Sequence, residues 1–157
     1  MRSVAFILLV LLAGCSAAPP PPVSATLENI GIGYSEKQVR EVLGEPASEM
    51  TQGQEKLLLF KQKDTSFNIR VTLRKDSLVI VTGTHLQVEG KVYEPGTTAQ
   101  TITEHMGEHD ERVVRWAGWE QLTWLRGKTA IKVVFRDKIM SSAEIELLPE
   151  FAEPEVQ

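Results

Sequence analysis

The sequence predicts an α+β protein with two tandem units, each a short helical segment packed on an antiparallel β-meander. Residues 33–45 and 96–108 repeat one another without a gap, with a glycine, a helical apolar pattern and a Gly-Glu ending in both copies. Alternating apolar and polar residues follow each copy, with the period of a half-buried strand. Helices of about nine residues are not stable alone, so each needs packing against other structure. We therefore expect both helices to lie on strands.

The chain begins with the pattern of a secretory leader, over residues 1–14. Arg2 gives a positive start, and residues 4–13 form an unbroken apolar run. Spanning a membrane takes about 20 apolar residues, so this run has the length of a signal-peptide core. It ends in Leu-Ala-Gly-Cys at residues 12–15, and Cys15 is the only cysteine of the chain. We therefore expect processing between Gly14 and Cys15.

The Leu-Ala-Gly-Cys sequence resembles the lipobox of bacterial lipoproteins. The resemblance implies that Cys15 becomes the mature N-terminus and carries acyl chains, palmitate among them. At ~0.8 kcal/mol per buried methylene group, two chains already anchor a protein stably. Ser16 follows the cysteine, where an aspartate would signal inner-membrane retention, so the resemblance favours the periplasmic side of the outer membrane. The alternative is an idle cysteine behind an ordinary secretory signal.

Residues 15–24 are expected to form a lipidated, proline-rich tether. Four consecutive prolines at 19–22 favour a stiff polyproline II segment. A proline-rich ligand for an aromatic groove is the alternative.

The first predicted unit covers residues 25–90. Ser35 and a glutamine three residues later form the pattern of a capping box, and Gly44 lies where the helix must end. Strands are expected at 55–62, 67–73 and 78–81, with a tight turn at 75–76.

The second predicted unit covers residues 91–148 and repeats this plan. Thr98 can cap its helix, which Gly107 is expected to end. Strands are expected at 122–126, 131–136 and 139–145, joined by turns at 127–128 and 137–138. Each meander thus has about three predicted strands.

The pattern Gly-x-Ser-x-x-x-Val-x-x-x-Leu-Gly-Glu-Pro at residues 33–46, followed by a meander, resembles the SmpA/OmlA (BamE-like) family. It also resembles the related β-lactamase-inhibitor-like (BLIP-like) fold, in which two such units stand in tandem. The second copy departs from the pattern, because His109 replaces the proline. The first resemblance implies a non-catalytic protein-binding lipoprotein, accessory to outer-membrane protein assembly or envelope integrity. The second implies the alternative, an inhibitor or sequestering module for a periplasmic enzyme.

Composition argues against several functions. Lys and Arg number 17 against 21 Asp and Glu, a net charge of −4, which disfavours nucleic acid as a partner. A single cysteine excludes a disulfide framework and multi-cysteine metal sites. The glutamates near the end of the chain make residues 149–157 an acidic tail, which we expect to be solvated; a docking role is the alternative.

Catalytic and metal motifs are weak in this sequence. His105 and His109 have the i, i+4 spacing of a metal pair on a helix, but Gly107 lies between them and is expected to end the helix. The residues at 127–129 lack the preceding glycine of a phosphate loop, because that position is Leu122. We therefore expect no enzyme, cofactor or metal site, and a metal-dependent hydrolase is a distant third hypothesis.

Three residues are the candidate partner contacts: Trp116, Trp119 and Arg115. Trp and Arg dominate the energetic hot spots of protein interfaces. The two tryptophans flank Gly118 in a predicted loop, whereas Trp124 aligns with an apolar strand position and is expected in the core. A tryptophan at a membrane surface is the alternative for a tethered protein.

Overall fold

The computed structural model describes residues 24–62, 68–116 and 118–151. The predicted signal peptide, Cys15, most of the tether and the end of the acidic tail lie outside the described residues. Among the residues described, no helix has the length and apolarity needed to cross a membrane.

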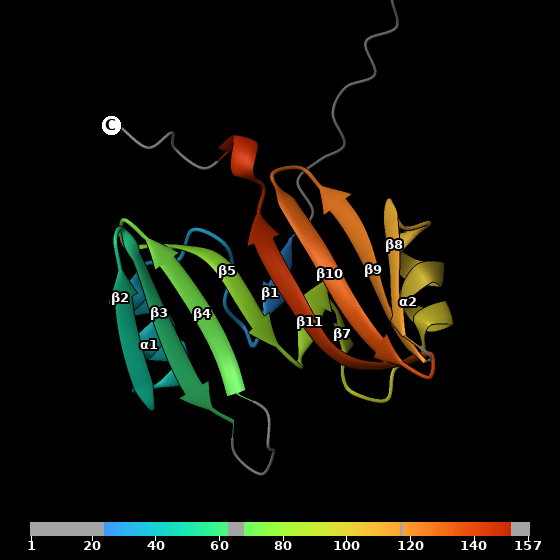
Figure 1. Ribbon diagram of the computed structural model, residues 1–157, viewed down its shortest axis with the longest axis horizontal. Helices are drawn as coiled ribbons and strands as arrows, with labels where there is room; N and C mark the ends of the chain where they lie inside the picture. Colours follow the sequence, from blue (N-terminus) through green and yellow to red (C-terminus); the bar gives the residue numbers. More distant parts are fainter. Residues whose placement is uncertain (1–23, 63–67, 117, 152–157) are drawn as a thin grey trace, which may run out of the picture.

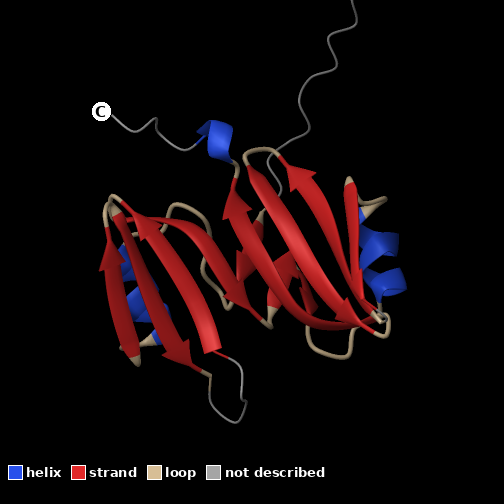
Figure 2. Ribbon diagram, viewed as in Figure 1, coloured by secondary structure: helices blue, strands red, loops and turns tan. Residues whose placement is uncertain are grey.

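Two sheets and two short α-helices make up the described fold (Figures 1 and 2). In chain order, the elements are β1 Ala25–Leu27, α1 Glu36–Leu43, β2 Ser48–Gln52, β3 Glu55–Lys61, β4 Asn68–Arg74, β5 Ser77–Gly83, β6 Leu86–Val88, β7 Lys91–Tyr93, α2 Ala99–Met106, β8 Glu111–Trp116, β9 Trp119–Arg126, β10 Thr129–Arg136, β11 Ile139–Leu147 and the 3₁₀ turn η1 Pro149–Phe151. The large sheet has the order β2-β3-β4-β5-β11-β10-β9-β8, and the small one the order β1-β6-β7. All strand pairs are antiparallel.

The α+β class with antiparallel strands is present, and strands predominate. Each helix precedes a meander, β2–β5 after α1 and β8–β11 after α2. Each meander has four strands where about three were predicted. The missed strands, β2 and β8, are exposed at every residue, so they lack the apolar alternation that marks a half-buried strand. Strands β5 and β11 pair, which joins the two meanders into one sheet.

The helix ends follow the predicted chemistry. Ser35 accepts a hydrogen bond from the Gln38 backbone N–H, and the Ser35 N–H donates to the Gln38 side chain, which completes the capping box. Thr98 caps α2 in the same way, through the N–H of Thr101. Each helix ends at a glycine with φ +81°, a conformation that a side chain would strain.

Equivalent backbone contacts fix the start of each helix against the last turn of its meander. The Gly33 N–H donates to the Leu78 carbonyl at 2.9 Å, and the Gly96 N–H donates to the Met140 carbonyl at 3.2 Å. Gly33 and Gly96 are the first residues of the two sequence repeats. The repeated sequence therefore occupies repeated backbone positions.

One face of the large sheet carries the core. The helices and the small sheet lie against this face, behind the large sheet in Figure 1. Val39 of α1 and Ile102 of α2 are fully buried there, as are Val71, Ile131 and Trp124 of the sheet. Alternate residues of the same strands project from the opposite face, which no element of the described residues covers. This uncovered side is called the open face below.

Two predicted turns and the start of the acidic tail have defined backbone conformations. The turns at 75–76 and 137–138 form as predicted, with positive φ at both residues of each turn. Residues 149–151 of the acidic tail form a 3₁₀ turn, because Pro149 occupies a first helical position, where its missing N–H costs nothing.

Candidate functional site

The candidate tryptophans lie in strands, where a loop was predicted. Trp116 is the last residue of β8 and Trp119 the first residue of β9, and the two are directly paired. A β-bulge at Arg115 shifts the register just before this pair. Gly118, between the strands, has φ +79°, and a Cβ there would run into the Asp137 side chain. The predicted loop is instead a tight hairpin, because Gly118 adopts a positive φ that lets Trp116 and Trp119 pair directly.

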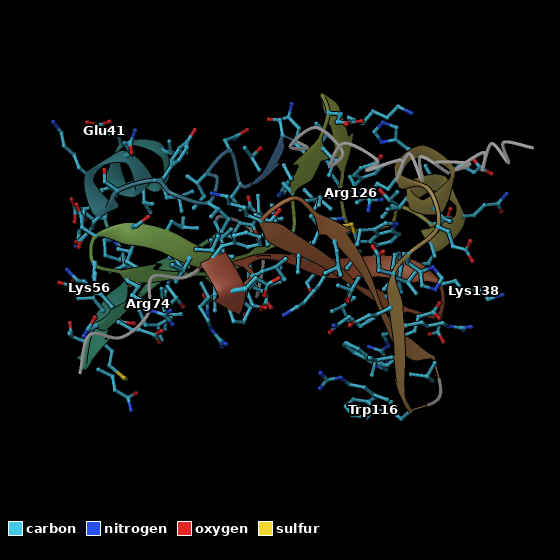
Figure 3. The ribbon with its side chains drawn as sticks, turned by 90° about the horizontal axis from the view of Figure 1, so that it is seen from above. Glu41, Lys56, Arg74, Trp116, Arg126 and Lys138 are labelled. Carbon is cyan, nitrogen blue, oxygen red and sulfur yellow. The ribbon has the colours of Figure 1, made fainter. Side chains whose placement is uncertain are left out.

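The two tryptophan rings form a tilted pair, and Figure 3 shows Trp116 on the open face, away from the helices. Their centroids are 6.0 Å apart, with 53° between the ring planes. The Trp116 residue is 61% exposed and Trp119 is half-buried. The Arg136 guanidinium of β10 stands 6.0 Å from the Trp119 centroid, within the range of a cation–π interaction. Large aromatic area is thus left in water beside a fixed positive charge.

A hollow of about 390 Å³ opens beside this pair. Its lining comes from four adjacent strands and consists of Arg115, Trp116, Trp119, Glu120, Gln121, Val134 and Ser142. The structure therefore brings all three predicted contact residues to one place. It adds Gln121, Val134 and Ser142, which the sequence analysis missed because their proximity depends on the pairing of β9, β10 and β11. Such a surface can hold a flat or branched apolar group and offer polar contacts at its rim.

A second hollow, of about 410 Å³, lies at the same end of the sheet and shares Trp119. Arg112 and Val114 of β8 contribute to it, with Asp137 and Lys138 of the turn before β11.

The two histidines with metal-like spacing engage different partners. The Nδ1 atom of His105 contacts the Tyr93 hydroxyl, and the His109 ring packs edge-on against Trp124 at a centroid distance of 6.2 Å. Burial, with the nearby Glu89 charge, raises the pKa of Tyr93. Within the described ranges, no group of three His, Cys, Asp or Glu side chains is placed to bind a metal ion.

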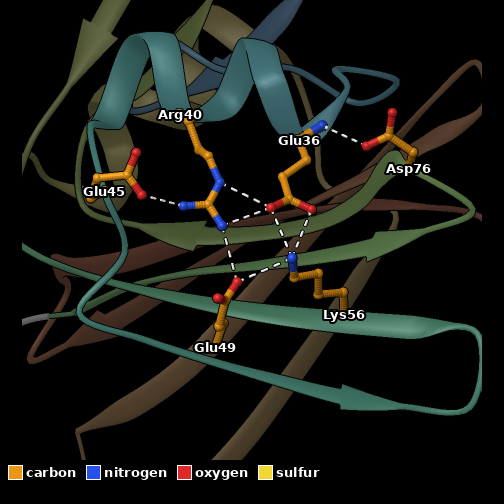
Figure 4. Close-up of polar contacts among 6 residues, drawn as sticks. All are labelled: Glu36, Arg40, Glu45, Glu49, Lys56 and Asp76. Carbon is orange, nitrogen blue, oxygen red and sulfur yellow. Dashed lines mark hydrogen bonds and ion pairs between the residues drawn. The ribbon is translucent and has the colours of Figure 1, made fainter.

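Beneath α1 lies a polar network that ties the helix to β2 and β3 (Figure 4). The Glu36 carboxylate accepts hydrogen bonds from Lys56 at 2.8 Å and from Arg40 at 2.7 Å. These hydrogen bonds lower the pKa of Glu36, and the one from Lys56 has the larger effect. Glu49 of β2 contacts both cations at 3.0–3.1 Å. The charges are mutually satisfied, so the network fastens the helix and offers no free group for chemistry.

A second polar cluster surrounds the buried Glu28 carboxylate. Its Oε1 atom accepts hydrogen bonds from the backbone N–H groups of Thr84 at 2.7 Å and His85 at 2.9 Å. The Thr84 hydroxyl also donates to Glu28, at 3.2 Å. Thr84 is buried, so this hydroxyl is inaccessible as a nucleophile. The cluster braces the β5–β6 connection, and sequence analysis missed it because Glu28 and Thr84 lie 56 residues apart.

Comparisons with known proteins give likeness of fold only. No protein-family model and no curated protein matches the sequence. Among solved structures, the chain is similar to an extracellular SCP-domain protein from Bacillus anthracis, with 11% identity and a TM-score of 0.56 over 76% of this chain and 44% of that one. It is also similar to a cysteine-rich secretory protein from Staphylococcus aureus, with 17% identity and a TM-score of 0.51 over 76% and 45%. This chain thus spans less than half the length of both proteins.

A third similar structure is a weaker likeness. It is a candidate beta-lactamase inhibitor protein from Streptococcus mutans, 20% identical, with 77% of this chain and 88% of that one covered. Its TM-score of 0.30 is too low to indicate a shared fold. None of these likenesses bears on the SmpA/OmlA family.

Proposed function

We propose that this chain is a non-catalytic protein-binding module of the bacterial envelope, which contacts its partner through the open face at Trp116 and Trp119. The observation that carries the proposal is the placement of the ring pair. Burying an aromatic side chain is worth about 1.5–3 kcal/mol, so leaving Trp116 in water sacrifices folding stability that a binding surface can recover. Exposed Trp beside Arg is the composition of interface hot spots.

The proposal includes the arrangement and the location that the sequence predicts. The two helix-plus-meander segments, at residues 25–90 and 91–148, are tandem copies of one unit, as in the BLIP-like fold. The Gly33–Leu78 and Gly96–Met140 contacts support this duplication. The lipobox resemblance at Cys15 supports anchoring at the outer membrane, where the module would serve protein assembly or envelope integrity.

The binding surface is tested by replacing Trp116 with a photocrosslinking amino acid in the full chain and irradiating intact cells. We expect one discrete adduct, identified by mass spectrometry. The matched control is the same substitution at Met50, which is equally exposed at the far end of the sheet and should give no such adduct. The proposal fails if position 116 gives no adduct, or if position 50 gives the same one.

The identity of the adduct separates the functional alternatives. An outer-membrane assembly component would support the accessory role. A periplasmic enzyme that loses activity when the purified chain is added in equimolar amount would support the inhibitor role.

The anchor is tested separately, by comparing membrane and soluble fractions of cells that express the native chain or Cys15→Ser. We expect the native chain in the membrane fraction and the Cys15→Ser chain outside it. Identical processing and fractionation would refute lipidation without touching the binding surface.

A further inference from the structure

Within the described residues, the outer edge of β8 has no partner strand. β8 ends the large sheet, all six of its residues are exposed, and within the described residues it pairs only with β9. Natural edge strands usually avoid pairing with other chains through proline, charged side chains (lysine above all), β-bulges or shortness. β8 contains neither proline nor lysine, and its bulge lies at Arg115 near the end of the strand. Val113, Val114 and Trp116 all favour extended backbone. Its outward N–H and C=O groups can therefore accept another strand.

The opposite edge of the sheet differs in character. β2 has the sequence Ser-Glu-Met-Thr-Gln, with Met50 as its only large apolar residue. Glu49 holds β2 in the ion-pair network beneath α1. The two ends of the sheet thus differ: β2 exposes one large apolar residue, whereas β8 exposes three, Val113, Val114 and Trp116.

Arginines outnumber acidic residues on β8, with Arg112 and Arg115 against Glu111. Arg115 is exposed and, within the described residues, makes no ion pair, while Arg136 lies over the Trp119 ring. Arg112 pairs with Glu120 at 2.9 Å, but the arginine side chain is much more exposed than its partner. An incoming segment with carboxylates would complement these cations and gain affinity and orientation.

The position of α2 limits what can pair with β8. Figures 1 and 3 both show α2 projecting past β8, on the helix-bearing side of the sheet. Edge-to-edge pairing of two copies about a two-fold axis would bring both projecting helices to the same side and into one another. An extended peptide segment carries no such helix and fits beside β8.

We propose that β8 captures an extended, acidic segment of a partner protein by strand addition. Main-chain hydrogen bonds to the β8 edge supply affinity, and alternate side chains supply specificity. A carboxylate of the segment faces Arg115, and an apolar side chain enters the hollow beside Trp116 and Trp119. This inference rests on the proposed binding function and specifies its partner.

Fluorescence anisotropy with labelled peptides of about six residues tests the inference on the full chain. The first peptide alternates glutamate with valine, the second alternates lysine with valine, and the third is the acidic peptide with prolines at two central positions. We expect the acidic peptide to bind and both others to bind about tenfold more weakly or worse. Proline removes the N–H donors that an added strand needs.

Matched variants locate the site. Val113→Asp on β8 should weaken the acidic peptide about tenfold, whereas Met50→Asp on β2 should leave its affinity within about twofold. Arg115→Glu should weaken it similarly, whereas Arg70→Glu on β4, also exposed, should not. Hydrogen exchange should show new amide protection in β8 when peptide binds. Circular dichroism confirms that each variant is folded.

The inference is overturned if the acidic peptide does not bind, or if the proline peptide binds equally well. It is also overturned if the β8 variants and the control variants lose the same affinity, or if the new amide protection lies outside β8. An adduct at position 116 in cells together with no peptide binding would refute strand addition while the binding function stands. If neither the adduct at position 116 nor peptide binding is found, the strand-addition inference and the proposed binding function are both refuted.

Discussion

The indole Nε1 of Trp124 donates a hydrogen bond to the carbonyl oxygen of Gly107, at 3.0 Å. Trp124 lies on β9 and is fully buried, and Gly107 is the residue at which α2 ends. The last carbonyl groups of a helix have no partner within it, so this bond satisfies one of them and fastens the helix to the sheet. The structure thereby confirms the predicted core position of Trp124.

Trp124→Phe removes this donor and part of the buried ring volume. We expect the free energy of unfolding to fall by about 1–3 kcal/mol, as measured by urea denaturation. Trp116→Phe is the matched control and should change it by less than about 0.5 kcal/mol, because that ring is mostly in water. Equal losses in the two variants would show that Trp116 also belongs to the core.

Glu28→Ala should destabilise the connection between β5 and β6. The substitution leaves the backbone N–H groups of Thr84 and His85 without their carboxylate acceptor, and we expect a loss of about 2–4 kcal/mol in unfolding free energy. Glu94→Ala is the control, since that exposed carboxylate stands 3.9 Å from the His85 ring and accepts no backbone hydrogen bond there. A loss below that of the control would mean that water replaces the carboxylate.

Glu36→Gln should make the free energy of unfolding depend less on pH in the acid range. Hydrogen bonds from Lys56 and Arg40 lower the pKa of Glu36 below its ordinary value of 4.5, so the folded state favours the ionised carboxylate. Its contribution is complete above that value and is lost as the pH falls through the lowered pKa. Denaturation measured from pH 7 down to about pH 3 should therefore show a shallower decline for Glu36→Gln. Glu41→Gln, an exposed change on the same helix, should keep the native slope.

The predictable parts of this fold depend on local chemistry. Caps at Ser35 and Thr98 and glycines at 44 and 107 act within a few residues, so sequence alone places both helices. The inner strands also show their alternation locally. The edge strands carry no such signal, because neither of their faces is buried.

The candidate site was predictable by residue type but not by geometry. Trp116, Trp119 and Arg115 are neighbours in the sequence, and the hairpin keeps them together. Val134 and Ser142 join them only because β9, β10 and β11 pair in one register, which depends on contacts between distant residues. The pairing of β5 with β11 is equally non-local, so the sequence does not predict that two meanders form one sheet.

Quenching of tryptophan fluorescence distinguishes the local charge around the ring pair from the charge of the whole chain. The net charge of −4 would draw caesium ions and repel iodide, whereas Arg115 and Arg136 would draw iodide to the exposed Trp116 ring. Local charges dominate within a Debye length, about 10 Å at 0.1 M salt.

We therefore expect iodide to quench the tryptophan fluorescence more strongly than caesium. Trp116→Phe should remove most of the quenching by iodide, and Arg115→Glu should make caesium the stronger quencher. Trp124, fully buried, should contribute a fraction that neither ion quenches. Stronger quenching by caesium in the native chain would mean that the cations do not face the rings, and it would remove the charge basis for an acidic partner.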